Sequence, residues 1–250
     1  MIKHFFLSVF LVLLANSYSF GQTYDFLDPE LKRLTGQKGI QIDPQALPAY
    51  RHDGKKVSPS DIMNYLSKIE YQPAIYVDSK NNPAAIVFEV ASEEAKAAKI
   101  KMYENVKGGD FMLNETAPNF LLRDMDDNLI NLNNLKGEYV LLNFWFVGCK
   151  PCVMEMPELN ELVEEFKPKG IHFLAIGLDN PDRVTTFLKK QEFDYTLLPY
   201  GETVAGEYGV TSYPTHLLLD KEGKVIFSQQ GYFPGLKYTL RRRLLDAVKK

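Results

Sequence analysis

The only two cysteines of the chain, Cys149 and Cys152, stand three residues apart and are the side chains best suited to covalent chemistry. As a structural cross-link, so short a loop would stabilise the fold by about 2 kcal/mol in the chain-entropy model, against about 4.7 kcal/mol for a hundred-residue loop. The spacing suits a redox couple better, in which one thiolate attacks a disulfide and the neighbouring thiol releases the partner. We therefore predict that Cys149 attacks and Cys152 resolves.

The flanking elements are predicted to place this pair at the junction of a strand and a helix. Residues 139–146 are apolar except for Asn143, as in a strand buried on both faces, and residues 151–166 are predicted to be helical. A helix N-terminus lowers the pKa of a thiol from its usual value near 8.5. We therefore expect the Cys149 sulfur to be exposed and easily ionised. Lys150 adds a positive charge, and Pro151 suits an early helical position.

The remainder of residues 111–250 alternates between strand and helix patterns, which predicts an α/β domain with a central mixed sheet flanked by helices. The turn Asp220-Lys221-Glu222-Gly223 predicts a hairpin, and Asn180 is predicted to cap a helix. The expected strands are 171–178, 195–198, 215–219 and 224–229, and the expected helices are 181–191, 202–208 and 236–248.

Residues 22–110 differ in character and are predicted to form a small α/β module. A helix at 58–69, strands at 74–77 and 84–88, and a solvated helix at 92–103 are expected there. Residues 107–110 are the expected linker. No chemistry is evident in this module, so its role is left open.

Residues 1–21 resemble a signal peptide. A basic start precedes an apolar run at residues 5–15, and cleavage is expected between Gly21 and Gln22. The alternative is an uncleaved anchor, but a bilayer span needs about 20 apolar residues. The mature protein is therefore expected to be periplasmic or otherwise exported, without a membrane anchor. The net charge of −3 for the whole chain predicts no nucleic-acid partner.

The stretch Trp145-Phe-Val-Gly-Cys-Lys-Pro-Cys resembles the active site of the thioredoxin superfamily, and the lead-in at 117–120 resembles its TlpA-like branch. The likeness covers residues 112–250. It implies a thioredoxin-like fold and an exported disulfide reductase, related to those that serve cytochrome c maturation. Residues 210–215 match the loop that carries a cis-proline. By this resemblance Pro214 faces the cysteines, and the backbone of Tyr213 helps to hold an extended substrate.

Glu155 is a further candidate for proton transfer. This sequence differs from the thioredoxin that it resembles at two positions. Asn143 stands where thioredoxin has Asp, and Gly148 stands where thioredoxin has Trp. Glu155 lies three residues after Cys152 on the same predicted helix face, as in the TlpA-like Cys-x-x-Glu-x-Pro arrangement. We hypothesise that Glu155 tunes the thiols and shuttles a proton for Cys152. The alternative is that it only favours the first turns of its helix.

Trp145 and Tyr213 have two readings each. Trp145, the only tryptophan, ends a buried strand and is predicted either to fill the core or to pack at the site beside the substrate. Tyr213 either selects substrate or packs against the cysteine pair.

A peroxidase of the peroxiredoxin type is one alternative function. It would need Pro-x-x-x-Thr-x-x-Cys, but Leu142 and Phe146 occupy the matching positions before Cys149, and Trp145 and Cys149 occupy those before Cys152.

A Cu(I)-binding protein is another, with His216 as a third ligand. Copper-delivery relatives use the wider Cys-x-x-x-Cys spacing, and a strand histidine is more often a hydrogen-bonded core residue. No metal site is predicted. A third alternative is a docking protein with only incidental redox capacity. A different interpretation of residues 22–110 is that they recruit the substrate or a membrane electron donor. The reductase needs no bound cofactor, because electrons travel by thiol–disulfide exchange with exported protein disulfides or dithiols.

Overall fold

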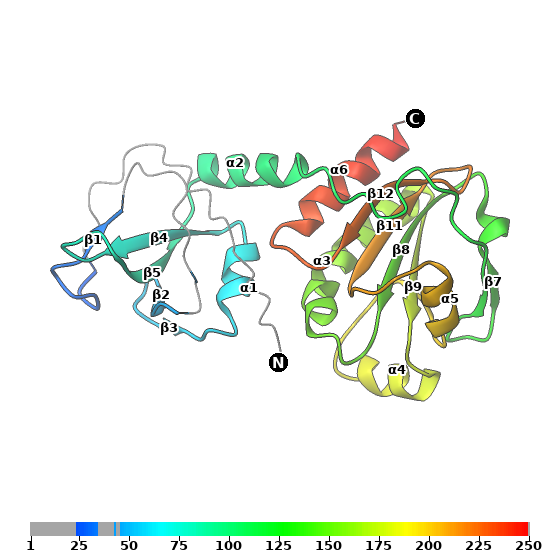
Figure 1. Cartoon of the computed structure of the whole chain (residues 1–250), viewed down its shortest axis with the longest axis horizontal. Helices are drawn as coiled ribbons and strands as arrows, with labels where there is room; N and C mark the ends of the chain where they lie inside the picture. The colour runs from blue at the N-terminus through cyan, green and yellow to red at the C-terminus, as the bar shows by residue number, and fades with distance from the viewer. Residues whose placement is uncertain (1–23, 35–42, 44–45, 250) are drawn as a thin grey trace. The chain divides into compact units, whose positions relative to one another are not determined.

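A computed structural model describes residues 24–34, 43 and 46–249, and divides the chain into two compact units between Lys101 and Met102 (Figure 1). The expected signal peptide, residues 1–21, lies outside the described residues. The division falls inside helix α2 (Glu93–Glu104), earlier than the boundary at residues 110 and 111 expected from the sequence.

The described residues of the N-terminal unit form a five-stranded sheet in the order β1-β4-β5-β2-β3. Its remaining elements are β1 (Lys32–Arg33), β2 (Ala49–Arg51), β3 (Lys56–Val57), α1 (Ile62–Ser67), β4 (Tyr71–Val77) and β5 (Pro83–Val90). The strands predicted at 74–77 and 84–88 are confirmed as β4 and β5, which pair antiparallel. The other strands have two or three residues each, too few to show a period of two. The helix expected at 58–69 is shorter because its first turn is a loop, in which Asp61 N–H donates to Ser58 O.

The C-terminal unit contains the thioredoxin-like fold, and the predicted fold class is confirmed. Its sheet has the order β10-β9-β8-β11-β12; β8, β9 and β10 are parallel, and β11 and β12 are antiparallel to their neighbours. The strands are β6 (Leu121–Arg123), β7 (Leu129–Asn131), β8 (Tyr139–Trp145), β9 (Ile171–Gly177), β10 (Thr196–Leu198), β11 (Thr215–Leu219) and β12 (Val225–Gln230). The helices are α3 (Lys150–Phe166), α4 (Pro181–Leu188), α5 (Glu202–Glu207), α6 (Leu236–Val248) and the 3₁₀ turns η1 (Leu132–Leu135) and η2 (Lys167–Lys169).

Side chains alternate between the two faces of this sheet, as the period of two requires. On β8, Leu141 and Trp145 enter a core shared with α3, α4 and α6, whereas Val140, Leu142 and Phe144 enter a core shared with α5 and η1. Full burial of one such side chain contributes about 1.5–3 kcal/mol, so both cores hold the sheet.

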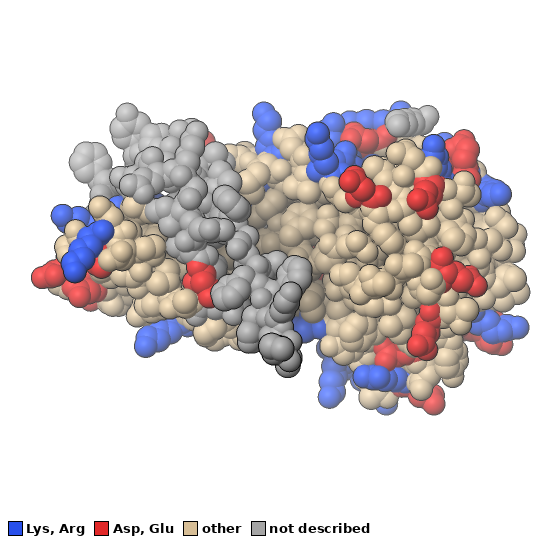
Figure 2. All heavy atoms as spheres, viewed as in Figure 1, with Lys and Arg blue, Asp and Glu red and all other residues tan. Residues whose placement is uncertain are grey.

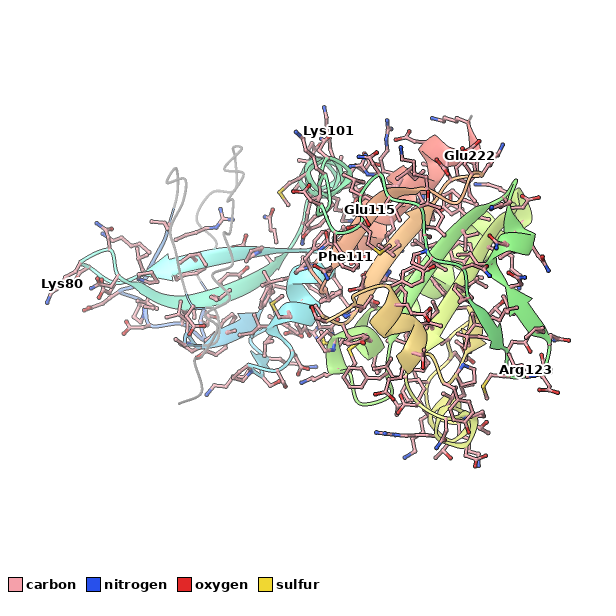
Figure 3. All side chains as sticks on the ribbon, turned by 45° about the vertical axis from the view of Figure 1, so that its right-hand side comes forward. Lys80, Lys101, Phe111, Glu115, Arg123 and Glu222 are labelled. Carbon is pink, nitrogen blue, oxygen red and sulfur yellow. A yellow bond between two sulfur atoms is a disulfide. The ribbon has the colours of Figure 1, made fainter. Side chains whose placement is uncertain are left out.

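The segment expected to be a linker lies against the edge strand β12. Gly109 N–H donates to Ser228 O at 2.8 Å, and Asn114 N–H donates to Val225 O at 2.9 Å. Figure 3 labels Phe111 and Glu115, which follow this segment in the chain. Such cover protects an edge strand from further pairing. These bonds explain why the compact unit begins before residue 110.

The described residues include no helix that is both long and apolar enough to cross a membrane. Figure 2 shows Lys and Arg side chains interspersed with Asp and Glu over the visible face, where neither sign forms a continuous patch.

Candidate active site

Cys149 and Cys152 are joined by a disulfide at the start of α3, directly after the loop that follows β8. Cys149 caps the helix, and its sulfur accepts the N–H of Cys152 at 3.2 Å. Pro151 lies in the first helical turn, where a missing N–H costs no intrahelical bond. The junction predicted from the sequence is therefore confirmed.

The expectation that the Cys149 sulfur is exposed is wrong for this oxidised form. Cys149 is 4% exposed and Cys152 is 1% exposed, and both belong to the core cluster between the sheet and α3. The half-buried rings of Phe146 and Tyr213 pack against the same cluster. These two rings meet edge to face, with centroids 5.4 Å apart.

A buried carboxylate holds the loop that precedes Cys149. Asp179, which follows β9, accepts the N–H of Val147 at 2.6 Å and pairs with Arg183 at 2.9 Å. Asn180 caps α4 as predicted, by accepting the N–H of Arg183. The sequence analysis did not identify Asp179. A carboxylate at the end of a buried parallel strand was the only signal.

The loop before β11 carries the predicted cis peptide bond, between Tyr213 and Pro214. Pro214 is buried, and its carbonyl accepts the N–H of Gly231 at 2.7 Å. Gly231 has φ +74°, a conformation that favours glycine, and no atom lies within 4 Å of a Cβ built there. It is therefore required for its backbone angle rather than for a close approach.

Glu155 lies buried in the interior on α3, one turn after Cys152. Asn143 Nδ2 donates to Glu155 Oε1 at 3.1 Å, and His216 Nε2 lies 3.1 Å from Glu155 Oε2. Burial, together with the charge of Glu155, raises the pKa of Tyr195 well above 10. Sequence reasoning named Glu155 and Asn143, but it did not connect either of them with His216.

The sequence around this site is similar to known thiol-disulfide oxidoreductases. The AhpC/TSA family matches residues 113–228. Thiol-disulfide oxidoreductase ResA of Bacillus thuringiensis (strain Al Hakam) is 40% identical over 116 residues, 46% of this chain and 67% of that protein. ResA of Halalkalibacterium halodurans is 32% identical over 137 residues, 54% of this chain and 76% of that protein. The chain belongs to the TlpA-like thiol-disulfide oxidoreductases.

A solved structure agrees with this family. A protein of Chlorobium tepidum assigned as the thiol:disulfide interchange protein DsbE superposes with a TM-score of 0.51 at 29% identity, over 54% of this chain and 97% of that one. This TlpA-like chain is therefore an enzyme of thiol–disulfide exchange with the thioredoxin-like fold. The family match lies entirely within the C-terminal unit.

The three other residues predicted to contact substrate have different surroundings. Lys150 and Pro151 are exposed beside the cysteines. Trp145 is fully buried and packs against Phe187 and Phe193, with centroids 5.5 Å away in each case. The prediction that Trp145 contacts substrate is therefore not supported by this arrangement, since the ring is covered on all sides.

His216 is on β11 and fully buried beside Glu155, so it is a hydrogen-bonded core histidine. Within the described residues, no group of three or more His, Cys, Asp or Glu side chains could hold a metal ion.

Proposed function

We propose that this TlpA-like enzyme is an exported disulfide reductase in which Cys149 attacks and Cys152 resolves. The observation that carries the proposal is the Cys149–Cys152 disulfide at the first turn of α3, directly after the sheet. A thiolate formed there lies where unpaired N–H groups and the helix dipole favour negative charge. The N–H of Cys152, which already reaches the Cys149 sulfur, is one such group.

The reaction starts from the dithiol form. The Cys149 thiolate attacks one sulfur of a substrate disulfide, and the other substrate sulfur leaves as a thiolate. Cys152 then loses its proton and attacks the Cys149 sulfur. The bond between Cys149 and the substrate breaks, and the second substrate sulfur leaves with the electron pair. Two electrons reach the substrate, which takes up two protons, and the protein is left with its disulfide.

Five neighbours are proposed to help this exchange. Pro214 and the backbone of Tyr213 hold an extended substrate segment beside the pair, and the exposed Lys150 and Pro151 contact it from the helix side. The positive charge of Lys150 favours the thiolate form of Cys149. Glu155 acts as the base for Cys152, because it is buried on the same helix one turn away.

The exported location is proposed from residues 1–21, with their basic start and short apolar run. No cofactor is required, because electrons arrive and leave through sulfur, and we propose a membrane protein as their donor. The ResA and DsbE relatives motivate a role in cytochrome c maturation.

The test is trapping in the native exported compartment with Cys152→Ser. This variant is expected to accumulate a mixed disulfide on Cys149, and the captured protein identifies the substrate. The midpoint potential of the wild-type pair, measured in redox buffers, is expected to be more negative than that of the compartment, where 30 mV corresponds to about 1.4 kcal/mol. A more positive potential would make the protein an oxidant and would reject the reductase assignment.

The peroxidase alternative is separated by one assay. The reduced protein is expected to consume no hydrogen peroxide above the rate of a free thiol, since Leu142 and Phe146 replace the proline and threonine that a peroxidatic cysteine would need. Rapid catalytic peroxide consumption would favour the peroxidase.

A further inference from the structure

We propose that His216 is a positioning residue that keeps the buried Glu155 side chain ionised, so that it can take the proton of Cys152. This inference rests on the proposed function, because it concerns the proton that the resolving thiol must lose. His216 is proposed to act only through Glu155, and not by contact with the substrate or with the sulfurs of Cys149 and Cys152.

The strand register brings the polar group together. His216 on β11 is paired directly with Asn143 on β8. The neighbouring residues on the same faces, Leu218 and Leu141, enter the core covered by α3. Two polar side chains therefore project from adjacent strands into an apolar layer, and Glu155 on α3 meets both.

Hydrogen bonding sets the proton positions within this group. Asn143 Nδ2 donates to Glu155 Oε1, which fixes the orientation of the amide. The same nitrogen lies 3.2 Å from His216 Nδ1 and 3.4 Å from Nε2. We place the ring hydrogen on Nε2, because Nε2 faces the carboxylate and a carboxylate can only accept. Nε2 lies 3.1 Å from both oxygens of Glu155. With the hydrogen placed there, the Nε2–H of His216 donates to a carboxylate that already receives one amide N–H.

Without such donors, a carboxyl group in this layer would adopt its neutral form, because burial disfavours charge. The neutral form cannot accept a proton from a thiol. Tyr195, which directly precedes β10, is an ionisable group that senses the charge of Glu155, and Cys152 lies one turn before Glu155 on α3. The pKa of Tyr195 is raised by burial first and by the Glu155 charge second, so it stays a neutral phenol and cannot replace the base.

The proton step completes the exchange already described. With the substrate held on Cys149, the Cys152 thiol gives its proton to Glu155 and becomes a thiolate. That thiolate attacks the Cys149 sulfur, and the substrate sulfur leaves with the electron pair. Glu155 returns its proton to water before the next cycle, and His216 keeps its own hydrogen on Nε2 throughout.

The experiment measures release of the mixed disulfide in a single turnover between pH 5 and 9. His216→Leu keeps the volume but removes the donor, and it is expected to slow release at pH 7 by about tenfold. This is less than the roughly 10²–10⁴-fold that a general base contributes, because Glu155 is still present. The deficit should shrink at high pH, where hydroxide can take the Cys152 proton. His216→Gln, whose amide can still donate to Glu155, should stay within about threefold of wild type. The first step, attack by Cys149, should be unchanged in both variants.

Glu155→Gln supplies the comparison if His216→Leu does not fold, and folding is checked by the fluorescence of the single tryptophan. Glu155→Gln should show the same change in the pH dependence of release as His216→Leu. The double variant, Glu155→Gln with His216→Leu, should release the mixed disulfide no more slowly than Glu155→Gln alone. The proposal is overturned if the leucine variant keeps the wild-type profile, if it is slowed equally at every pH, or if the glutamine variant is as slow as the leucine variant. Failure of the wild-type dithiol to reduce any disulfide would instead reject the proposed function.

Discussion

Replacement of Asp179 by alanine removes the side chain that holds the loop before Cys149. The carboxylate accepts the Val147 N–H at 2.6 Å and pairs with Arg183 at 2.9 Å, and the residue is 8% exposed. The alanine variant leaves the part-buried Val147 N–H without its acceptor.

The size of the effect follows from these two contacts. Loss of a hydrogen bond to a charged group costs about 1.5–3 kcal/mol. The Arg183 side chain is 60% exposed, so the ion pair itself contributes at most about 1 kcal/mol. We therefore expect Asp179→Ala to lower the free energy of unfolding of the C-terminal unit by about 2–3 kcal/mol. Arg183→Ala should cost less than about 1 kcal/mol.

Trp145 makes this measurable, since it is the only tryptophan and lies in the core of the same unit. Urea unfolding followed by its fluorescence should show a midpoint about 1–1.5 M lower for Asp179→Ala, with a slope of about 2 kcal/mol per M. Asp179→Asn, which keeps an acceptor for Val147, should fall between this variant and wild type. Equal midpoints for Asp179→Ala and Arg183→Ala would refute the reasoning, because they would mean that the backbone bond contributes nothing.

Three further predictions concern stability. Hydrogen bonds from Arg241 hold the pKa of Glu165 below 4.5, so this pair stabilises the fold above that pH and the effect is lost on acidification. Arg241→Ala should therefore cost about 1 kcal/mol at pH 7, discounted for partial exposure, and less at pH 3 in urea titrations. Burial lowers the pKa of Lys99 from 10.5 to about 8. Between these values the unfolded chain binds more protons than the folded one, so the N-terminal unit should gain stability as the pH rises from about 8 to 10.5. Circular dichroism melting should show that gain in wild type and none in Lys99→Met. Gly231→Ala should cost about 1–2 kcal/mol through its positive φ and loosen the bond to Pro214; an unchanged unfolding midpoint would contradict this.

Local sequence signals predicted most of the C-terminal unit. Asn180 marks a helix start because its side chain can accept a helical N–H, and residues 220–223 mark a hairpin because their turn chemistry is local. The short strands β1, β2 and β3 carried no such signal, since two or three residues cannot show a period. The position of residues 107–110 beside β12 could not be predicted, because the bonds of Gly109 go to Ser228, which is distant in sequence.

The site was predictable where its residues are neighbours in sequence, as with Cys149 and Cys152. The partnership of Asn143 with His216 depends on the register between β8 and β11, across 73 positions, which no local pattern specifies. Its only sequence trace is that each residue interrupts an apolar strand. The burial of Cys149 likewise depends on packing. Its place at a helix N-terminus can be predicted from sequence, but the side chains that cover its sulfur cannot.

The most direct test of the account is a single-turnover reaction between the purified dithiol protein and a model disulfide peptide, resolved by thiol trapping and mass spectrometry. Wild type should reduce about one disulfide per molecule and end with its own cysteines bridged. Cys152→Ser should stop at a mixed disulfide on Cys149, and Cys149→Ser should form none. Two results would contradict the account. In the first, Cys149→Ser forms an adduct on Cys152 as fast as Cys152→Ser forms one on Cys149. In the second, the wild-type dithiol transfers no electrons to the peptide.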